Sequence, residues 1–505
     1  MLQSDKSPGP DGLHPHLLKS CAQALAKPLS LIFRCSYETG TLPTDWKLAH
    51  ISPVFKKGSK SDPSNYRPIS LTSVPCKLME SILKDRIVSF IESGDGFNKF
   101  QHGFIKGKSC LTNLLETFEA WTTALDDGYD VDMVYLDYRK AFDAVPHARL
   151  LHKLATFRID SHLLAWIKNF LLSRHIRVCV RKSSSGWVLV VSGVPQGSVI
   201  GPLLFILYVD DLPDTIKNSI RMFADDTKIW AVVKSDQDVT SLQSDLDELA
   251  KWSDMWLLSF NIDKCKVMHL GHRAPASYYL QEGPVRKLIQ TVTEERDLGV
   301  HVKSDLKPSL HCGRAAAKAS STLGLIRRHF KHIDKESFLI LYKAYIRPHL
   351  EYCVQSWSPS LVKDITCLKQ IQRRATKMVD SLCKLSYSER LSSLGLTTLA
   401  TRRLRGDLIE TYKILTHKKR TDPSQFFSFN DSGYALRGHS LKLYKPSVRL
   451  NVRKHFYSYR VIDSLNQLPQ HVVEAPTVNA FKNRLDKHWR CHSNWTSYLN
   501  IDADN

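Results

Sequence analysis

The chain lacks the features that mark secreted, zinc-binding and membrane-spanning proteins. Its 11 cysteines stand singly between Cys21 and Cys491, without a C-x-x-C pair or a cysteine–histidine finger spacing. This argues against a disulfide framework or structural zinc and favours a reducing compartment. The N-terminus has no apolar signal-peptide core, and the longest apolar run, Val199–Val209, is interrupted by Gly201-Pro202 and too short to span a bilayer. We therefore expect an intracellular protein, in the nucleus or cytoplasm, without a secretion signal or a membrane partner.

Acidic residues are scarce relative to basic ones. The 505 residues include 50 Asp and Glu against 71 Lys and Arg, which gives a formal net charge of +21. Such an excess favours a polyanionic partner, although a basic protein without nucleic acid is the alternative. The hydrophobic content of 43% is normal for globular proteins, and the length exceeds that of one ordinary domain. Internal repeats and low-complexity tracts are also absent.

Two adjacent acids occur where they are costly to hold. Phe223-Ala224-Asp225-Asp226 lies between apolar segments, and residues 229–233 alternate between two faces, a period that predicts a strand. We expect a β-hairpin with both carboxylates at its turn. On its own the pair is also typical of a solvated turn, because Asp is a common turn former. Held between apolar strands, however, two acids require a cation or a partner that neutralises them.

A third acid, Asp137, ends the predicted buried strand Val131–Tyr138. If this strand and the hairpin are neighbours, Asp137, Asp225 and Asp226 converge on one sheet edge. Such carboxylates suit two divalent cations about 3.5–4 Å apart, which activate an attacking oxygen and stabilise a leaving phosphate oxygen. Mg²⁺ prefers carboxylate and phosphate oxygens and keeps several waters, so we expect Mg²⁺, with Mn²⁺ as the alternative ion.

Three motifs occur in an order that resembles a known family. They look like motifs A, B and C of reverse transcriptases, and specifically those of non-LTR (LINE-type) retrotransposons of the jockey/CR1 kind. The motifs are Tyr135-Leu136-Asp137-Tyr138-Arg139-Lys140-Ala141-Phe142-Asp143, Val194-Pro195-Gln196-Gly197-Ser198 and Phe223-Ala224-Asp225-Asp226. Supporting boxes lie at residues 7–12, 42–46, 65–70, 101–104 and 297–300. The resemblance covers residues 1 to about 300, and the later half also looks like the carboxyl region of these elements.

The resemblance implies a role for each matching residue. The three acids would be catalytic and would bind the metal ions, with Asp137 and Asp225 the firmest ligands and Asp226 either a ligand or a support. Five further residues would contact the incoming nucleotide: Arg67, Tyr138, Phe142, Gln196 and Lys57.

These nucleotide-binding roles have specific chemistry. Arg67 would bind the triphosphate with its guanidinium fork, helped by Lys56 and Lys57, whose alternative is a solvated turn. Phe142 would clash with a ribose 2′-hydroxyl and so select deoxyribonucleotides, although a core aromatic is equally compatible with its position. Gln196 would touch the nucleotide from a loop shaped by flanking Pro and Gly residues.

A second aromatic-x-Asp-Asp sequence, Tyr208-Val209-Asp210-Asp211, needs separating from the first. It follows a predicted apolar helix, and no alternating strand follows it. In enzymes of the family that this chain resembles, an acidic pair at this place is not catalytic, so we assign the catalytic acids to Asp225 and Asp226. The basic, aromatic tail could bind RNA; its candidates are Arg449, Arg453, Lys454, Tyr457, Tyr459 and Arg460.

The resemblance implies a right-hand polymerase of the α+β class with an antiparallel palm sheet. We expect fingers and N-terminal boxes at 1–130, the palm at 131–300, a helical thumb or connection at 301–420 and a basic C-terminal region at 421–505. The implied reaction is RNA-directed DNA synthesis from dNTPs on a primer 3′-hydroxyl. The partners would be an RNA template and a DNA primer, with the element's own RNA as a further candidate.

The sequence also departs from the family. Because the sequence begins at the first polymerase box, we expect a protein without an endonuclease domain, and we find neither a zinc knuckle nor a ribonuclease H acid set. Two alternative functions therefore stay open: an inactive nucleic-acid-binding retroelement remnant, and a maturase-like helper of RNA folding.

Overall fold

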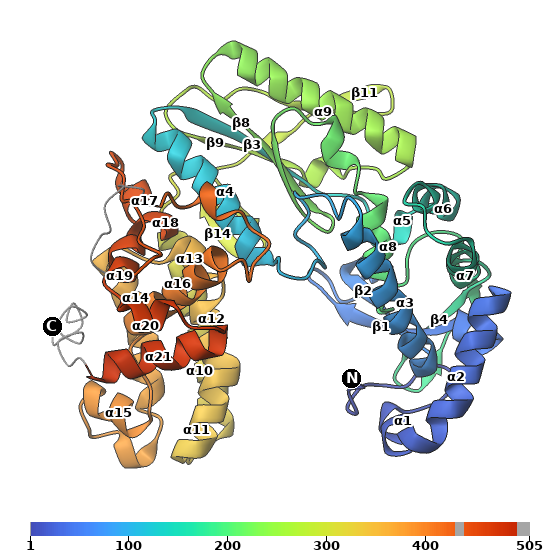
Figure 1. Cartoon of the computed structure of the whole chain (residues 1–505), viewed down its shortest axis with the longest axis horizontal. Coiled ribbons are helices and arrows are strands. Elements are labelled where there is room, and N and C mark those ends of the chain that lie inside the picture. The colour runs from blue at the N-terminus through green and yellow to red at the C-terminus, as the bar shows by residue number, and fades with distance from the viewer. Residues whose placement is uncertain (1, 430–438, 492–505) are drawn as a thin grey trace.

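The computed structural model describes residues 2–429 and 439–491, which form an arch (Figure 1). A sheet and the long helix α9 (Asp236–Trp256) span the top of the arch. The N-terminal elements form one limb, and the C-terminal helices form the other. No helix in the described part of the chain is both long and apolar enough to cross a membrane.

The sheet at the top of the arch carries the three predicted acids at its edge. Its strands run in the order β12 (Gln290–Thr291), β9 (Lys266–Leu270), β3 (Asp130–Leu136), β8 (Asp226–Val233) and β7 (Ser219–Phe223). Strand β3 is antiparallel to both β8 and β9. Val131 and Met133 belong to one hydrophobic core, whereas Val134 and Leu136 belong to another. Both faces of β3 are therefore buried, which explains why apolar residues of this strand point to both sides of the sheet.

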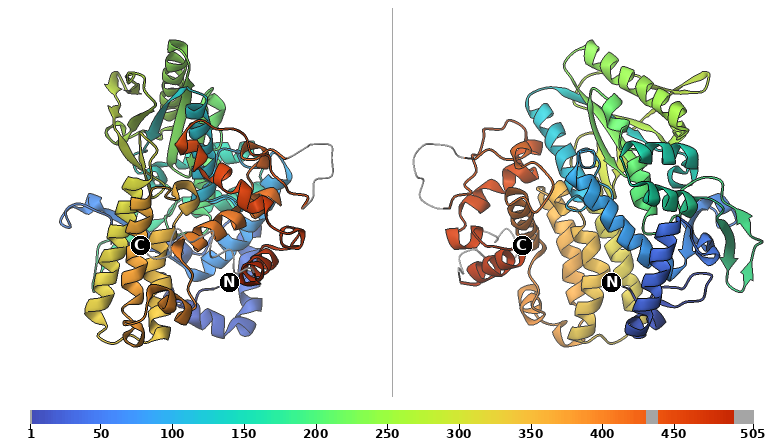
Figure 2. Two further views of the ribbon diagram at one scale, coloured as in Figure 1. Left: turned by 90° about the vertical axis from the view of Figure 1, so that its left-hand side faces the viewer. Right: turned by 45° about the vertical axis from the view of Figure 1, so that its right-hand side comes forward.

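Helices cover the two faces of this sheet. One face packs against α9 and α8 (Gly201–Tyr208), and the other packs against α4 (Cys110–Asp126). Helix α4 begins with a capping box, in which the side chains of Ser109 and Thr112 each accept the backbone N–H of the other residue. Most of its residues are buried, because the C-terminal limb covers the side that faces away from the sheet (Figure 2).

The N-terminal limb carries a second sheet. Its strands are β1 (Leu48–Phe55), β2 (Tyr66–Thr72), β4 (His175–Val180), β5 (Ser183–Ser184) and β6 (Val188–Leu189). Because β4 pairs with β1, this sheet draws strands from both sides of the boundary expected at residue 130. The helices of this part are α1 (Pro15–Ser20), α2 (Ala22–Thr39), α3 (Val74–Ser93), α5 (Ala141–Ala144), α6 (His147–Thr156) and α7 (Ser161–Leu171).

Two hairpins and a set of helices complete the chain. The hairpins are β10 (Tyr279–Glu282) with β11 (Val285–Leu288), and β13 (Glu294–Asp297) with β14 (Val300–Lys303). The helices are α10 (Ser309–His329), α11 (Lys335–Leu341), α12 (Arg347–Glu351), α13 (Val354–Trp357), α14 (Val362–Thr376), α15 (Tyr387–Ser393), α16 (Leu399–Leu415), α17 (Asn451–Lys454), α18 (Tyr457–Arg460), α19 (Ile462–Asn466), α20 (Gln470–Val473) and α21 (Val478–Cys491). Of the region expected at 421–505, residues 430–438 and 492–505 lie outside the described residues.

The tail does not offer all of its predicted RNA-binding residues to solvent. Arg453 forms an ion pair with Glu119 of α4, and Arg460 forms one with Asp407 of α16. Tyr457 is fully buried. The prediction that these three tail residues bind RNA is therefore wrong, because each one is used in packing the C-terminal limb.

The mixed α+β fold with an antiparallel sheet that carries the acids is confirmed. Residues 296–300 form the centre of the β13–β14 hairpin. Leu298 and Gly299 have φ values of 44° and 91°, and this left-handed turn reverses the chain.

Candidate active site

The turn between β7 and β8 brings the acidic pair to the edge of the sheet. Phe223 pairs with Asp226, so Asp225 lies in the turn and Asp226 begins β8. Leu136 of β3 pairs with Thr227 of β8, which places Asp137 beside the turn. The strands that carry the three predicted acids are therefore neighbours, as the sequence interpretation required.

Asp225 and Asp226 sit in an environment that disfavours their charge. Burial is the main cause of the raised pKa of Asp225, and Asp137 raises it further, whereas Arg67 and Lys56 act in the opposite direction. Asp226 is exposed to solvent, but the protein around it displaces enough water to raise its pKa to about 6, with Asp225 as the next cause. Lys264 donates a hydrogen bond of 3.3 Å to Asp137. The cluster thus holds negative charge that nearby cations only partly balance.

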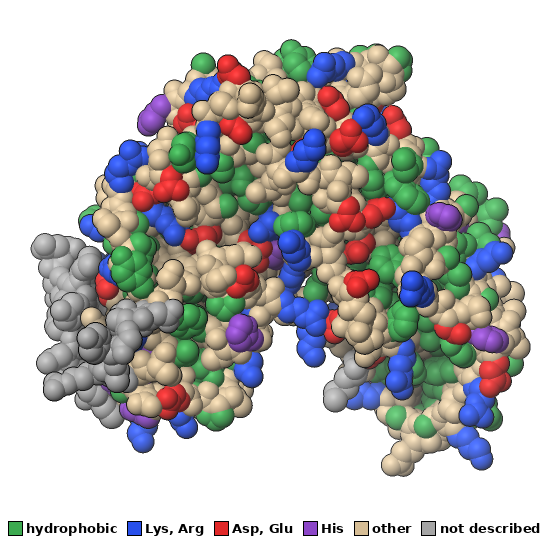
Figure 3. All heavy atoms as spheres, turned by 45° about the horizontal axis from the view of Figure 1, so that its top comes forward, with side chains coloured by type: hydrophobic (Ala, Val, Ile, Leu, Met, Phe, Trp, Pro, Cys, Tyr) green, Lys and Arg blue, Asp and Glu red, His purple; other side chains and the backbone are tan. Residues whose placement is uncertain are grey.

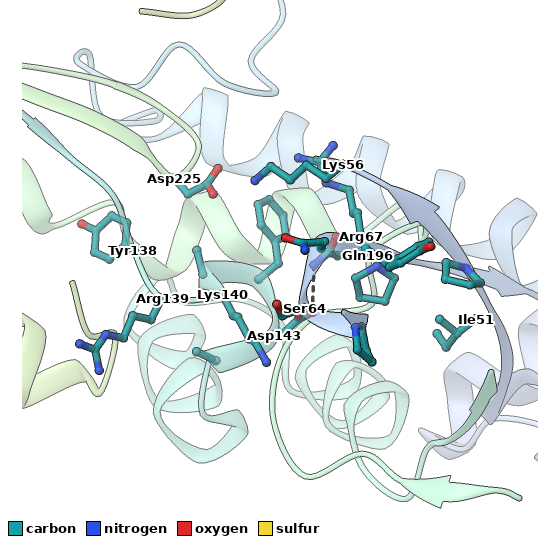
Figure 4. A pocket seen from close by; sticks show the side chains of 18 of the residues that line it. Ile51, Lys56, Ser64, Arg67, Tyr138, Arg139, Lys140, Asp143, Gln196 and Asp225 are labelled. Atoms are coloured by element: carbon teal, nitrogen blue, oxygen red, sulfur yellow. Dashed lines mark hydrogen bonds between the residues drawn. The ribbon is translucent and has the colours of Figure 1, made fainter. Parts of the chain in front are cut away.

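The three acids face two different spaces. Asp137 and Asp225 line an open pocket of about 1450 Å³ between the two sheets (Figure 4). Asp226 instead lines a small polar pocket of about 130 Å³ on the far side of Asp137. Lys228 and Asp297 face the small pocket and form a buried ion pair with each other. Asp137 is therefore the acid that borders both spaces.

The predicted nucleotide-binding residues meet in the large pocket. Its lining includes all five: Lys57, Arg67, Tyr138, Phe142 and Gln196. In Figure 4, Arg67 and Lys56 extend from the β1–β2 strands on the side of the pocket opposite Tyr138 and Arg139. Lys56 also lines the pocket, and it is Lys56, not Lys57, that acts on the pKa of Asp225.

Phe142 and Gln196 are held in fixed positions. The ring of Phe142 stacks on Phe205 with centroids 4.3 Å apart, and the ring of Phe104 is T-shaped to it with the two centroids 6.5 Å apart. Gln196 donates from Nε2 to Asp143 Oδ1 over 2.9 Å. Its backbone carbonyl accepts the N–H of Ser70 over 2.7 Å, which ties the loop to β2. Both side chains therefore enter the pocket from supported positions.

Comparison with known proteins agrees with this geometry. Residues 55–303 match the family described as reverse transcriptase (RNA-dependent DNA polymerase). This part of the chain is a reverse transcriptase domain. Its curated relatives come from non-LTR elements, as the motifs predicted.

Two relatives from Drosophila melanogaster illustrate the match. A probable RNA-directed DNA polymerase from transposon X-element is 28% identical over 389 residues, covering 74% of this chain and 42% of the relative. The RNA-directed DNA polymerase from mobile element jockey is 31% identical over 282 residues, covering 54% of this chain and 31% of the relative. The matches thus span less than half the length of each of these relatives.

Solved telomerase structures are also similar to this chain. Apo telomerase from Candida tropicalis aligns with a TM-score of 0.43 and 10% identity over 73% of this chain and 64% of that chain. Telomerase from Candida albicans, in complex with a fragment of telomeric RNA, aligns with a TM-score of 0.39 and 10% identity over 76% of this chain and 69% of that chain.

The second Asp-Asp pair of this reverse transcriptase serves its packing. Asp211 forms an ion pair with Lys153, whose ammonium group lies 3.8 Å from the centre of the Trp256 ring. Asp210 accepts the backbone N–H of Asn98 over 3.0 Å. Neither acid lines the large pocket or the small pocket beside it, in contrast to Asp225 and Asp226.

The donor groups of the reverse transcriptase site fit a divalent cation that keeps water and substrate oxygens in its shell. Reverse transcriptases use divalent metal ions. Asp137 and Asp225 present carboxylate oxygens to the same pocket, and carboxylates are the ligands that Mg²⁺ prefers. Within the described residues, no three acidic, histidine or cysteine side chains lie close enough together to hold an ion by themselves. Substrate phosphates and water would therefore have to complete the coordination.

Sequence reasoning did not assign every residue that shapes the pocket. Phe104 and Asp143 lie in motifs that were recognised, but neither was given a role. Lys264 and Asn261 come from a loop whose sequence carries no motif, so only the fold brings them to Asp137.

Proposed function

We propose that the chain is the RNA-directed DNA polymerase of a non-LTR retrotransposon. It would add deoxynucleotides to a primer 3′-hydroxyl as directed by an RNA template. One observation carries the proposal: Asp137 and Asp225 share a pocket with Arg67, which faces them from another sheet. A triphosphate bound between them would have cationic groups at its phosphate tail and carboxylates near its α-phosphate.

The acids would act through bound cations. When bound, two Mg²⁺ ions supply activation of the attacking hydroxyl and stabilisation of charge on the transferred phosphate. Asp137 and Asp225 would hold them, and the protein would otherwise contribute positioning and a preorganised electrostatic field. Asp226, which faces the smaller pocket, fits a supporting role better than Asp225 does.

The other residues would select and orient the nucleotide. Arg67 and the neighbouring lysines Lys56 and Lys57 would bind the β- and γ-phosphates, since a guanidinium fork matches phosphate oxygens. Phe142, fixed against Phe205, could not move aside for a 2′-hydroxyl. Gln196 would contact the nucleotide from the loop anchored to β2, and Tyr138 would support the site from the end of β3.

The arch offers room for a template and primer. Figure 3 shows Lys and Arg side chains projecting into the hollow between its two limbs. Such side chains suit the phosphate backbone of a nucleic acid, and the formal charge of +21 favours the same partner. The element's own RNA is the template class that the relatives suggest.

Primer extension with matched variants tests this proposal. The purified chain would be given poly-rA, oligo-dT, dTTP and Mg²⁺, with RNA binding measured in parallel. We expect wild-type extension that is abolished by Asp225→Asn and strongly reduced by Asp226→Asn, with RNA binding retained in both. Asp210→Asn is the matched control. Asp210 belongs to the second aromatic-x-Asp-Asp sequence and lies outside the pocket, so this variant should preserve extension.

Two outcomes would contradict the proposal. A folded wild-type chain that binds RNA but does not extend the primer would leave the inactive remnant as its function. Extension that survives Asp225→Asn would show that the hairpin turn is not the catalytic centre.

A further inference from the structure

Residues 100–103 act as an additional partner of β7. On one side β7 pairs with β8, and on the other side it bonds to this segment. The N–H of Met222 donates to the carbonyl of Phe100 over 3.0 Å, and the N–H of His102 donates to the carbonyl of Met222 over 2.8 Å. Asn113 of α4 donates a further hydrogen bond of 3.1 Å to the same carbonyl. The strand that leads into the acidic turn is therefore fixed along both edges.

The side chain of Gln101 continues this contact into the turn itself. Its Oε1 accepts the N–H of Ala224 over 2.8 Å and the N–H of Gly103 over 2.8 Å. Gln101 is 1% exposed, so neither hydrogen bond competes with bulk water. Gln101 thus binds the backbone group that immediately precedes Asp225.

The turn requires such support. Ala224 has a φ of 56°, a left-handed conformation that is unfavourable for a residue with a side chain. Gly103 makes room for the turn, since a Cβ at this position would lie 2.4 Å from the nitrogen of Ala224. In contrast, the Nε2 of Gln101 is buried and has no hydrogen-bond partner within the described residues. A buried amide whose N–H groups have no partner is costly. This cost indicates that the residue at this position serves through its acceptor oxygen, Oε1.

We propose that Gln101 is a positioning residue that sets the direction of the Asp225 carboxylate by fixing the Ala224 peptide. The inference rests on the proposed polymerase function. Gln101 touches neither substrate nor metal ligand atoms and acts only through the turn. A catalytic carboxylate must be held close to its productive geometry, because a misplacement of about 1 Å can cost about 100-fold in rate.

Two substitutions separate positioning from general stability. Gln101→Met keeps the length of the side chain but removes the acceptor, whereas Gln101→Glu keeps an acceptor oxygen. Gln372 offers a matched control in α14: it is fully buried, donates to the Thr397 carbonyl over 3.1 Å and accepts from Tyr387 over 2.7 Å. Gln372→Met therefore removes an equally buried amide that lies far from the turn in sequence.

Rapid-quench primer extension would measure the burst rate and the burst amplitude separately. We expect Gln101→Met to lower the burst rate, which reports chemistry per active molecule, by about 10–100-fold. Gln101→Glu should recover most of the rate, and Gln372→Met should reduce thermal stability but keep the wild-type burst rate. A Gln101→Met enzyme with a wild-type burst rate and only a smaller amplitude would overturn the inference.

A second readout does not depend on catalysis. Binding of Mn²⁺ to each variant would be followed by electron paramagnetic resonance, and Gln101→Met should weaken binding at least about threefold while Gln372→Met does not. If the wild type does not extend the primer at all, the proposed polymerase function fails, and this titration alone decides the inference. Equal Mn²⁺ affinity of wild type and Gln101→Met would then overturn it.

Discussion

Breaking the buried ion pair beneath the acidic turn should destabilise the protein strongly. Lys228 of β8 and Asp297 of β13 have side chains only 4% and 6% exposed, and they bind each other. Burial is the main cause of the lowered pKa of Lys228, and the attraction of Asp297 opposes it. Removing one member of such a pair leaves an uncompensated buried charge, which typically costs about 3–5 kcal/mol. We therefore expect Lys228→Met to lower the free energy of unfolding by about that amount.

The double variant shows whether the pair or the individual side chains matter. When both charges are replaced by apolar groups, the desolvation cost disappears, and the result is often neutral or stabilising by about 1–4 kcal/mol. Urea unfolding of Lys228→Met, Asp297→Leu and the double variant would give the coupling energy. We expect the double variant to be clearly more stable than either single variant. Strictly additive losses would refute the reasoning, because they would mean that the two charges are not coupled.

Three further predictions concern selectivity, pH and packing. In single-nucleotide assays, Phe142→Val should raise rCTP incorporation relative to dCTP by at least about 10-fold, or about 1.4 kcal/mol. An unchanged ratio would contradict the role of Phe142 in excluding the 2′-hydroxyl. His311, whose pKa burial lowers to about 4 from 6.5, stays neutral in the fold, so its contribution to stability is complete above pH 6.5 and falls between pH 6.5 and 4. Urea unfolding at pH 7.5 and 5 should show a loss of about 2 kcal/mol that His311→Asn lacks, whereas equal losses would contradict the assignment. Gly103→Ala should slow single-turnover extension at least about 10-fold without weakening RNA binding, because the added Cβ would lie 2.4 Å from the Ala224 nitrogen. Unchanged extension would show that the turn can move at no cost.

The sequence was most informative where periodicity and chemistry coincide. The alternation after Asp226 predicted β8, and the apolar segment before Asp137 predicted β3, because residues in a two-sided sheet must be buried in register. The pairing of these strands could be stated only as a condition, since strand neighbours far apart in sequence leave no local pattern. The motifs supplied the nucleotide-binding residues by resemblance, and the structure places them in one pocket without testing their roles.

The features that the sequence did not reveal depend on long-range partners. A basic residue has the same appearance whether it faces a phosphate or a buried carboxylate, so Arg453 was assigned to RNA although it pairs with Glu119. The separation of Asp226 from Asp225 likewise depends on the β13–β14 hairpin, which contributes Asp297 to the small pocket. Adjacent residues in a strand point to opposite sides, but the spaces on each side are created by distant segments.

The contact between the C-terminal limb and α4 has a consequence for damaged copies of the gene. The N–H groups of Arg449 and Leu450 both donate to Asp126, more than 300 residues away in the chain. Phe456 also stacks on Phe118 of the same helix, with ring centroids 6.3 Å apart. During translation, α4 must therefore wait for more than 300 further residues to be made before its outer face is covered. A premature stop codon ahead of Arg449 would spare every polymerase motif yet leave that face exposed, so intact motifs alone are a poor guide to which copies encode a stable enzyme.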